Sequence, residues 1–298
     1  MVNIIIGLIL GTIRQAAPLL ITAIGGIFCE ITGVVNIGLE GMMLMGAFSG
    51  AVGAYYTGSA WFGLIFAMFS GGLLASIHAL LSVKYKGNQV VSGVAINLFA
   101  GGFTVFMLKV LFSQAGNSPI AVRFPTLFKE SVFEMSGIVF IIYGLAIGAH
   151  FFLYKTVTGL RMRAVGEHPL AADTVGINVE KIRYFGVIMS GVLAGIGGAY
   201  LSIGTLAQFT KGMSSGRGFI ALAAMIFGKW TPFGAVGASL LFGFATALQG
   251  ILQQHVKSIP PQFIQMIPYL LTLLALAGVV GKAVAPSASG VAYDKNDE

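Results

Sequence analysis

Long apolar runs, separated by short polar stretches, take up most of the 298-residue chain. A helix needs about 20 apolar residues to cross the hydrocarbon core of a bilayer, and most of these runs reach that length. Such a chain cannot cover itself with a polar surface, because only 9% of its residues are charged, against about 25% in a soluble domain. We therefore predict an integral membrane protein. The apolar segments lie at 4–28, 33–57, 60–82, 90–112, 137–154, 184–208, 218–228, 232–254 and 262–281.

The character of these segments predicts helices. They are unbroken apolar runs without the strict alternation of a membrane β-barrel. With short loops, the chain length allows about eight to ten crossings. We expect one all-α domain over 1–298, a polytopic helical bundle in the cell membrane with the lipid bilayer around it. Arg14 interrupts the first run and no small-residue cleavage site follows, so we expect 4–28 to belong to the mature protein.

The distribution of Lys and Arg predicts the orientation. If each segment crosses once, one side receives ten of them and the other side five. The richer side holds the loop 155–183 and the polar tail 283–298, which we place in the cytoplasm. The side of the N-terminus depends on whether 4–57 crosses twice or three times, and both remain open. The ten are Lys84, Lys86, Lys155, Arg161, Arg163, Lys181, Arg183, Lys229, Lys282 and Lys295, and the five are Arg123, Lys129, Lys211, Arg217 and Lys257.

The net charge of +7 is interpreted as this orientation signal. No basic run is interleaved with aromatic residues on a polar face, so we expect no nucleic-acid partner.

Two segments are irregular. Segment 218–228 has only 11 residues, about 16 Å of helix against a core of about 30 Å. Segment 33–57 contains Glu40 between two glycines. Short or glycine-interrupted segments indicate a transport site. The two segments share a faint pattern, which either an internal repeat or chance explains: Ile37, Leu39, Met42 and Gly46 resemble Ile220, Leu222, Met225 and Gly228.

Polar residues in or beside apolar segments are candidates for a substrate path. A carboxylate in mid-bilayer costs a few kcal/mol, so it normally faces a partner or water. Amides there either bind a polar solute or tie helices together, and both readings stay open. The candidates are Asn36, Glu40, Gln89, Asn97 and Gln208.

Glycine pairs in these segments have a simpler interpretation. Gly191 and Gly195, like Gly46 and Gly50, are four residues apart, a spacing that lets helix backbones approach closely.

Catalytic motifs are missing from the sequence. It has no H-E-x-x-H, C-x-x-C, G-x-S-x-G or nucleotide-binding P-loop, and its four histidines show no metal-ligand spacing. We expect a transport subunit rather than an enzyme, with no metal or cofactor bound by this chain. Any ATP that drives transport is then used by another subunit.

The loop 155–183 carries the strongest signal. Pro169 suits the first position of a helix and Gly176 its end. The sequence therefore predicts a helix of about two turns that exposes Ala171 and Ala172, either as a docking element for a soluble partner or as an ordinary amphipathic loop helix.

The pattern Ala171-Ala172-x-x-x-Gly176 resembles the coupling-loop motif of ABC-importer permeases, in which two alanines precede a glycine by four. The family motif begins with Glu, and here that position is Leu170. The run from Arg163 to Ile177 is similar to the branch that handles ribose and branched-chain amino acids. Further stretches look like its nucleoside-uptake sub-branch: Gly33–Gly41, Ser92-Gly93, Gly216–Ala223 and Phe227–Trp230.

This resemblance implies partners and roles. The permease would pair with a second permease, related or identical. A cytoplasmic ABC ATPase would dock on the coupling loop, and an extracellular substrate-binding lipoprotein would deliver the solute. The residues that match the coupling region are Gly166, Glu167, Pro169, Ala171, Ala172 and Gly176.

Three other functions fit the sequence in part. A secondary transporter or channel explains the composition and the broken segments but leaves the loop 155–183 without a role. A permease of the same branch for a sugar or a branched-chain amino acid differs only in substrate. An intramembrane enzyme acting on lipid needs a catalytic cluster, which the sequence does not show.

Overall fold

The computed structural model describes residues 2–114, 116–127, 135–255, 260–267, 270 and 283–295. Helices make up about three quarters of this part, and one short antiparallel hairpin pairs Thr126 with Ser136. The elements are α1 (Val2–Glu30), α2 (Leu39–Thr57), α3 (Ala60–Ala79), the π-helix η1 (Leu80–Lys84), α4 (Gln89–Phe112), β1 (Thr126–Leu127), β2 (Met135–Ser136), α5 (Gly137–Lys155), α6 (Val157–Glu167), α7 (Pro169–Thr174), α8 (Val179–Ala199), the π-helix η2 (Tyr200–Leu206), α9 (Arg217–Phe227), α10 (Pro232–His255) and α11 (Pro261–Gln265).

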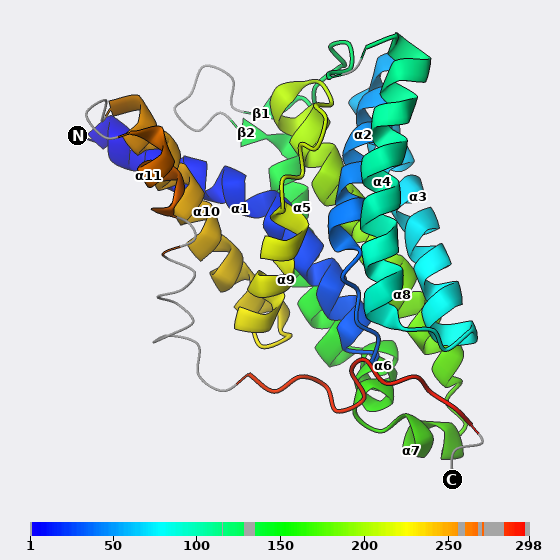
Figure 1. Ribbon diagram of the computed structural model, residues 1–298. Helices are drawn as coiled ribbons and strands as arrows, with labels where there is room; N and C mark the ends of the chain where they lie inside the picture. Colours follow the sequence, from blue (N-terminus) through cyan, green and yellow to red (C-terminus); the bar gives the residue numbers. More distant parts are fainter. Residues whose placement is uncertain are drawn as a thin grey trace.

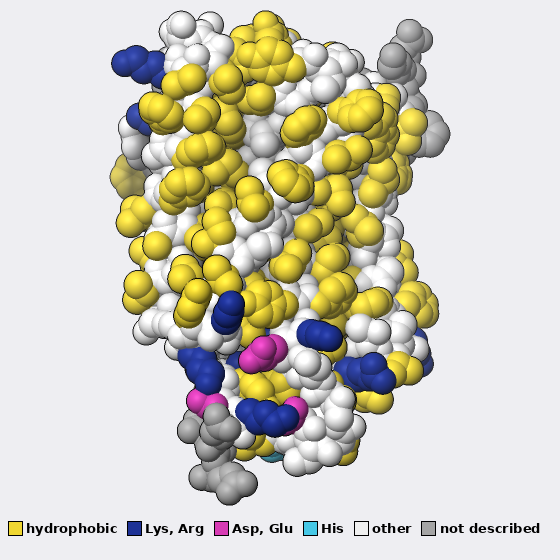
Figure 2. Space-filling model, turned by 90° about the vertical axis from the view of Figure 1, so that its right-hand side faces the viewer, with side chains coloured by type: hydrophobic (Ala, Val, Ile, Leu, Met, Phe, Trp, Pro, Cys, Tyr) yellow, Lys and Arg dark blue, Asp and Glu magenta, His cyan; other side chains and the backbone are white. Residues whose placement is uncertain are grey.

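The predicted polytopic helical membrane protein is confirmed. In the described residues, six helices are long and apolar enough to cross a bilayer. Figure 2 shows apolar side chains over most of one face, with charged side chains gathered mainly near one end. The number of eight to ten crossings stays a prediction, since most of segment 262–281 lies outside the described residues. The six run over Ile4–Glu30, Ala60–Lys84, Gln89–Phe112, Gly137–Lys155, Val179–Leu206 and Pro232–Gln254.

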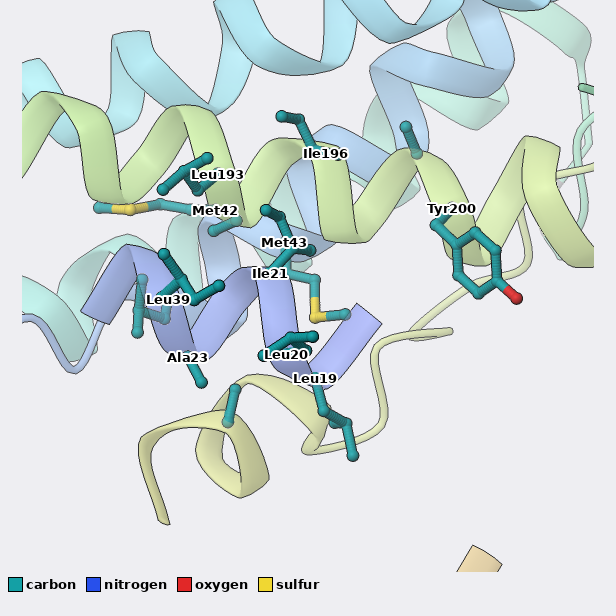
Figure 3. Close-up of a cluster of buried hydrophobic side chains, with 14 of the residues drawn as sticks. Leu19, Leu20, Ile21, Ala23, Leu39, Met42, Met43, Leu193, Ile196 and Tyr200 are labelled. Atoms are coloured by element: carbon teal, nitrogen blue, oxygen red, sulfur yellow. The ribbon is translucent and has the colours of Figure 1, made fainter. Parts of the chain in front are cut away.

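The helix α2 has 19 residues but a different environment from these six. It packs against α3, α4 and α8, and most of its side chains are buried. Its glycines and alanines let neighbouring helices come close. Figure 3 shows part of the resulting core, where Met42 and Met43 of α2 lie near Ile21 of α1 and Leu193 of α8.

Glycines set the distance between the central helices. A methyl group added at Gly46 would lie 2.5 Å from the Cα atom of Gly195, and one added at Gly191 or Gly195 would collide with backbone atoms of α3. Close approach through these glycines is therefore confirmed. At Gly50 an added methyl would meet its neighbours only at ordinary contact distance.

Figure 1 shows the path of the chain through 4–57. We call the end of the molecule that carries α6 and α7 the basic end, and the opposite end the far end. The N-terminus lies toward the far end and α1 descends toward α6 (Figure 1). The chain then returns toward the far end through α2, so 4–57 passes through the bundle twice (Figure 1). Of the basic residues counted above, Lys129, Lys257 and Lys282 lie outside the described residues.

Both irregular segments depart from a full-length membrane helix in the structure. Helix α1 ends at Glu30, Gly33 has a φ of +89°, and helix begins again only at Leu39. Helix α9 has 11 residues, as its sequence predicts, and a turn at Lys229 and Trp230 leads into α10. Because the chain from η2 runs back into the bundle before α9 starts (Figure 1), α9 begins within the molecule rather than at its far end.

Candidate functional site

Two adjoining cavities lie beside α1 and η2. Their volumes are about 400 and 380 Å³, and they share the lining residues Gln15, Tyr200 and Thr205. The first cavity also reaches the hairpin, through Thr126 and Ser136. Both are open on one side rather than enclosed. Since ligand sites are mostly concave and carry a few placed polar groups, these cavities are the candidate solute site.

The α1 wall of the cavities is polar at mid-membrane depth. Arg14 and Gln15 are exposed near the middle of the span Ile4–Glu30, about 24 Å along the helix from Glu30. A cation or an amide facing lipid at that depth is expensive. This face of α1 therefore meets water or protein rather than lipid.

The opposite wall is the π-helix η2. Such helices are rare and are often found at functional sites. Tyr200, its first residue, is 3% exposed. An added methyl at Gly204 would lie 2.7 Å from the Tyr200 ring, so the glycine makes room for that ring. The Tyr200 hydroxyl points away from the apolar cluster in Figure 3.

The second cavity continues to the start of α9, where Ser215 and Arg217 line it. Glu40 of α2 holds this helix end: its carboxylate accepts hydrogen bonds from the backbone N–H groups of Gly216 (2.8 Å) and Gly218 (2.6 Å). A carboxylate is favourable at a helix N-terminus, where N–H groups lack helical partners. Glu40 thus fastens the short helix α9 to α2.

The predicted amides surround the break between α1 and α2. The Asn36 side chain donates to Ser190 Oγ (2.7 Å) and accepts from Gly38 N–H (3.0 Å). Asn97 accepts from Gly41 N–H (2.7 Å) and donates to the Ile37 carbonyl (3.0 Å).

Gln89 contributes in the same way, since its side-chain oxygen accepts from Val35 N–H at 2.7 Å. These bonds satisfy backbone groups that a broken helix would leave bare inside a membrane. The structure therefore brings Asn36, Glu40, Gln89 and Asn97 together around the break, and none of them lines either of the two cavities. Gln208 lies apart, half-buried in the connection after η2.

The cavity residues Gln15, Tyr200 and Thr205 were not singled out by the sequence analysis. The signal that could have found them is the adjacent pair Arg14-Gln15 in the middle of an apolar run. Tyr200 and Thr205 carried no such signal, because a π-helix is not visible in the hydrophobic pattern.

The predicted helix in the loop 155–183 is confirmed as α7. Pro169 is its first residue, and Gly176 beyond its end has a φ of +83°. The expected exposure of Ala172 is wrong: its side chain is 4% exposed and packs with Val165 and Val179, while Ala171 is exposed. One face of a six-residue helix must cover the protein beneath it, and Ala172 is on that face. The large apolar side chains exposed on α7 and just after it are those of Leu170, with an exposed fraction of 50%, and Val175, with 74%.

The other residues of the predicted coupling region lie beneath and beside α7. Gly166 is buried against the Ile31 carbonyl, and its own carbonyl accepts from Ala288 N–H at 2.9 Å. The Glu167 carboxylate accepts from the Ser287 hydroxyl at 2.8 Å.

The C-terminal segment 283–295 crosses the basic end as a strap. Gly290 N–H donates to the Gly33 carbonyl (3.1 Å), and Arg183 donates to the Val291 carbonyl (2.8 Å). Lys295 pairs with Asp173 of α7 at 3.1 Å. A hydrogen bond from Lys295 to Asp173 raises the pKa of the Lys295 ammonium above its usual value. The strap therefore joins α7, α8 and the break after α1.

Comparisons with known proteins identify the family. The family model for the permease component of branched-chain amino acid transport systems matches residues 8–276. The chain is 45% identical to the guanosine ABC transporter permease protein NupQ of Bacillus subtilis, covering 95% of each chain. It is 42% identical to the nucleoside ABC transporter permease protein NupC of Lactococcus lactis, covering 94% of each.

A solved structure shares the fold. PsaBC from Streptococcus pneumoniae, in complex with a Fab, superposes with a TM-score of 0.52 at 15% identity and covers 93% of this chain and 91% of that one. The match over residues 8–276 and the six membrane-length helices of the described part lead to one conclusion. The chain belongs to the permease-component family of branched-chain amino acid transport systems and is a multi-pass protein of the cell membrane.

Proposed function

We propose that this chain forms the translocation path of an ATP-driven importer for nucleosides. The observation that carries the proposal is its 45% and 42% identity, along nearly the whole length, to permeases named for guanosine and for nucleosides. A putative glucose permease of Haloferax volcanii is 34% identical, so a sugar is the second candidate. A nucleoside contains a sugar ring, and both solutes need hydrogen-bonding groups along their path.

The two cavities support a path for a polar solute. They lie in the half of the molecule toward the far end, and amide and hydroxyl side chains line them. With the basic end in the cytoplasm, the cavities would lie in the outer half of the membrane. An extracellular substrate-binding lipoprotein would deliver the solute at the far end. Beyond the two cavities, the path would run along the helix break that Asn36, Glu40, Gln89 and Asn97 hold, and past Gln208.

A cytoplasmic ABC ATPase would dock on α7. Its contact surface would be the exposed side chains of Leu170, Ala171 and Val175, a small apolar patch at the basic end. Pro169 and Gly176 would fix the ends of the helix, while Gly166, Glu167 and Ala172 would hold it on the core. This chain would bind no nucleotide itself, and the ATPase would use the ATP.

A second permease would close the open side of the cavities. The polar face of α1 around Arg14 and Gln15 needs a protein or water boundary, which a partner would supply. Two permeases of Bacillus subtilis carry guanosine in their names, and this chain is 45% identical to one and 27% to the other. It covers 83% of that second, longer permease. We propose that the partner is such a longer, non-identical relative.

Uptake in cells tests the substrate. The chain would be produced with its ATPase, its partner permease and its binding protein in a host strain without nucleoside uptake of its own. We expect labelled guanosine or uridine to enter, and unlabelled nucleosides to compete while glucose and leucine do not. Entry of glucose with no nucleoside entry would replace the proposed substrate by the sugar.

A further inference from the structure

We infer that Gln15, Tyr200 and Thr205 form the site that selects the solute, through hydrogen bonds to a molecule that offers donors and acceptors side by side. This inference rests on the proposed function and names the residues that would recognise the nucleoside. The three residues are the ones that both cavities share, so a solute that passes from one cavity to the other must pass them.

The three side chains come from two elements. Gln15 lies on α1, while Tyr200 and Thr205 lie at the start and near the end of η2. The two cavities measure about 400 and 380 Å³, within the range of small-molecule sites. The site therefore lies where α1 and η2 meet, at the boundary that the two cavities share.

Tyr200 presents a fixed hydroxyl. Its ring is packed into the fold at 3% exposure, and Gly204 leaves the space that the ring fills. Only the hydroxyl end is directed away from the apolar cluster (Figure 3). Because the ring faces are covered, Tyr200 would recognise a solute by hydrogen bonding and not by stacking on a base.

Thr205 and Gln15 complete the pattern. The Thr205 hydroxyl donates to the Leu201 carbonyl, which leaves its oxygen lone pairs as acceptors. The exposed Gln15 amide offers both donors and an acceptor. Together the three groups can bind the edge of a nucleobase or the hydroxyls of a ribose.

The charged side chains around the junction are all cationic among the described lining residues. Arg14, Lys211 and Arg217 line the cavities, and no acidic residue is among the described residues that line them. The ammonium group of a free amino acid would thus find no carboxylate partner here. Its carboxylate would find these cations, so the choice of solute depends on the hydrogen-bonding groups rather than on charge.

Three substitutions test the inference in the complete importer. Tyr200→Phe and Thr205→Val each remove one oxygen from the site with almost no change of volume, and Gln15→Ala removes the amide. Matched controls remove hydroxyls that line neither cavity: Tyr143→Phe removes one that donates to Ile13, and Thr246→Val one that donates to Phe242.

Initial rates of labelled nucleoside uptake would be measured at several concentrations and normalised to the amount of permease in the membrane. We expect each of the three variants to raise KM by about fivefold to tenfold and to change the order in which guanosine, uridine and their 2′-deoxy forms compete. We expect both controls to stay within about twofold of the wild type.

Unchanged KM and unchanged competition in all three variants would overturn the site, even with nucleoside uptake established in the wild type. If the wild type imports glucose and no nucleoside, the proposed function and the nucleoside class both fall. The same variants tested on glucose then decide the residues separately: a raised KM for glucose keeps the site and an unchanged KM removes it.

Discussion

A single carboxylate, that of Glu40, joins two helices that are far apart in the sequence. It accepts from Gly216 and Gly218, 176 and 178 residues away. Hydrogen bonds to a charged acceptor are about twice as strong as those between neutral groups. Glu40 therefore stabilises the fold by joining α2 to the start of α9.

Replacing Glu40 by Ala removes both carboxylate oxygens, so the backbone N–H groups of Gly216 and Gly218 lose their hydrogen-bond acceptors. We expect a loss of about 2–3 kcal/mol in stability, because hydrogen bonds to charged groups contribute about 1.5–3 kcal/mol. The measurement is thermal unfolding of the purified protein in detergent. Glu180→Ala, an exposed acid in the first turn of α8, is the control and should change little. Equal midpoints for the two variants would contradict the role of Glu40.

Gly198 lies in the core where α8 packs against α2. A methyl group added at Gly198 would collide with the backbone of Met43 and Ala47 on α2. We expect Gly198→Ala to destabilise the protein by about 1–3 kcal/mol. Gly144→Ala on α5, where an added methyl meets nothing within 4 Å, is the control and should be neutral or slightly stabilising. Melting temperatures in detergent compare them, and similar effects at both positions would show that α2 and α8 do not pack this closely.

At the scale of elements, α7 has an inner and an outer face. Ala172 is buried against Val165 and Val179, whereas Leu170 and Ala171 are exposed. A bulky residue at the inner face would damage packing whether or not α7 docks a partner. Docking is therefore tested by a substitution on the outer face, which leaves the packing of α7 intact.

Leu170→Glu places a charge on that outer face without touching the core. We expect this variant to insert into the membrane in normal amount. The ATPase should no longer co-purify with it, and the uptake rate should fall at least tenfold. Leu160→Glu is the control, since Leu160 on the neighbouring helix α6 is also exposed, at 58%, and lies outside the proposed docking patch. An ATPase that still co-purifies with Leu170→Glu would contradict docking through α7.

The elements differ in how far the sequence predicts them. The apolar segments, the short α9 and the start and end of α7 follow from hydropathy, Pro169 and Gly176, which are local signals. The partners of Asn36, Glu40, Gln89 and Asn97 do not, because they come from residues up to 178 positions away. The buried side of α7 was also missed, since its periodicity over six residues is too short to orient it.

At the scale of the whole molecule, the strap 283–295 connects the coupling region to the helix break. It contacts Gly33 after α1, Gly166 of α6 and Asp173 of α7. The proposed docking helix and the wall of the path are thus parts of one packed unit at the basic end.

Removing residues 284–298 would break these contacts. We expect faster trypsin cleavage in the loop 155–183, which holds Arg161 and Arg163, in membrane vesicles with the basic end outward. Lys295→Ala is the control, because it removes only an exposed ion pair worth about 0–1 kcal/mol. Equal cleavage rates for the shortened and the intact chain would show that the strap does not hold the coupling region.

The most direct test of the account is the energy source of transport. The complete importer would be placed in proteoliposomes loaded with or without ATP on the side of the basic end, and uptake of labelled nucleoside would be measured with the binding protein outside. If the chain is part of an ATP-driven importer, uptake requires ATP hydrolysis and persists when ionophores remove all ion gradients. Nucleoside uptake without ATP that an ionophore abolishes would contradict it and establish a secondary transporter.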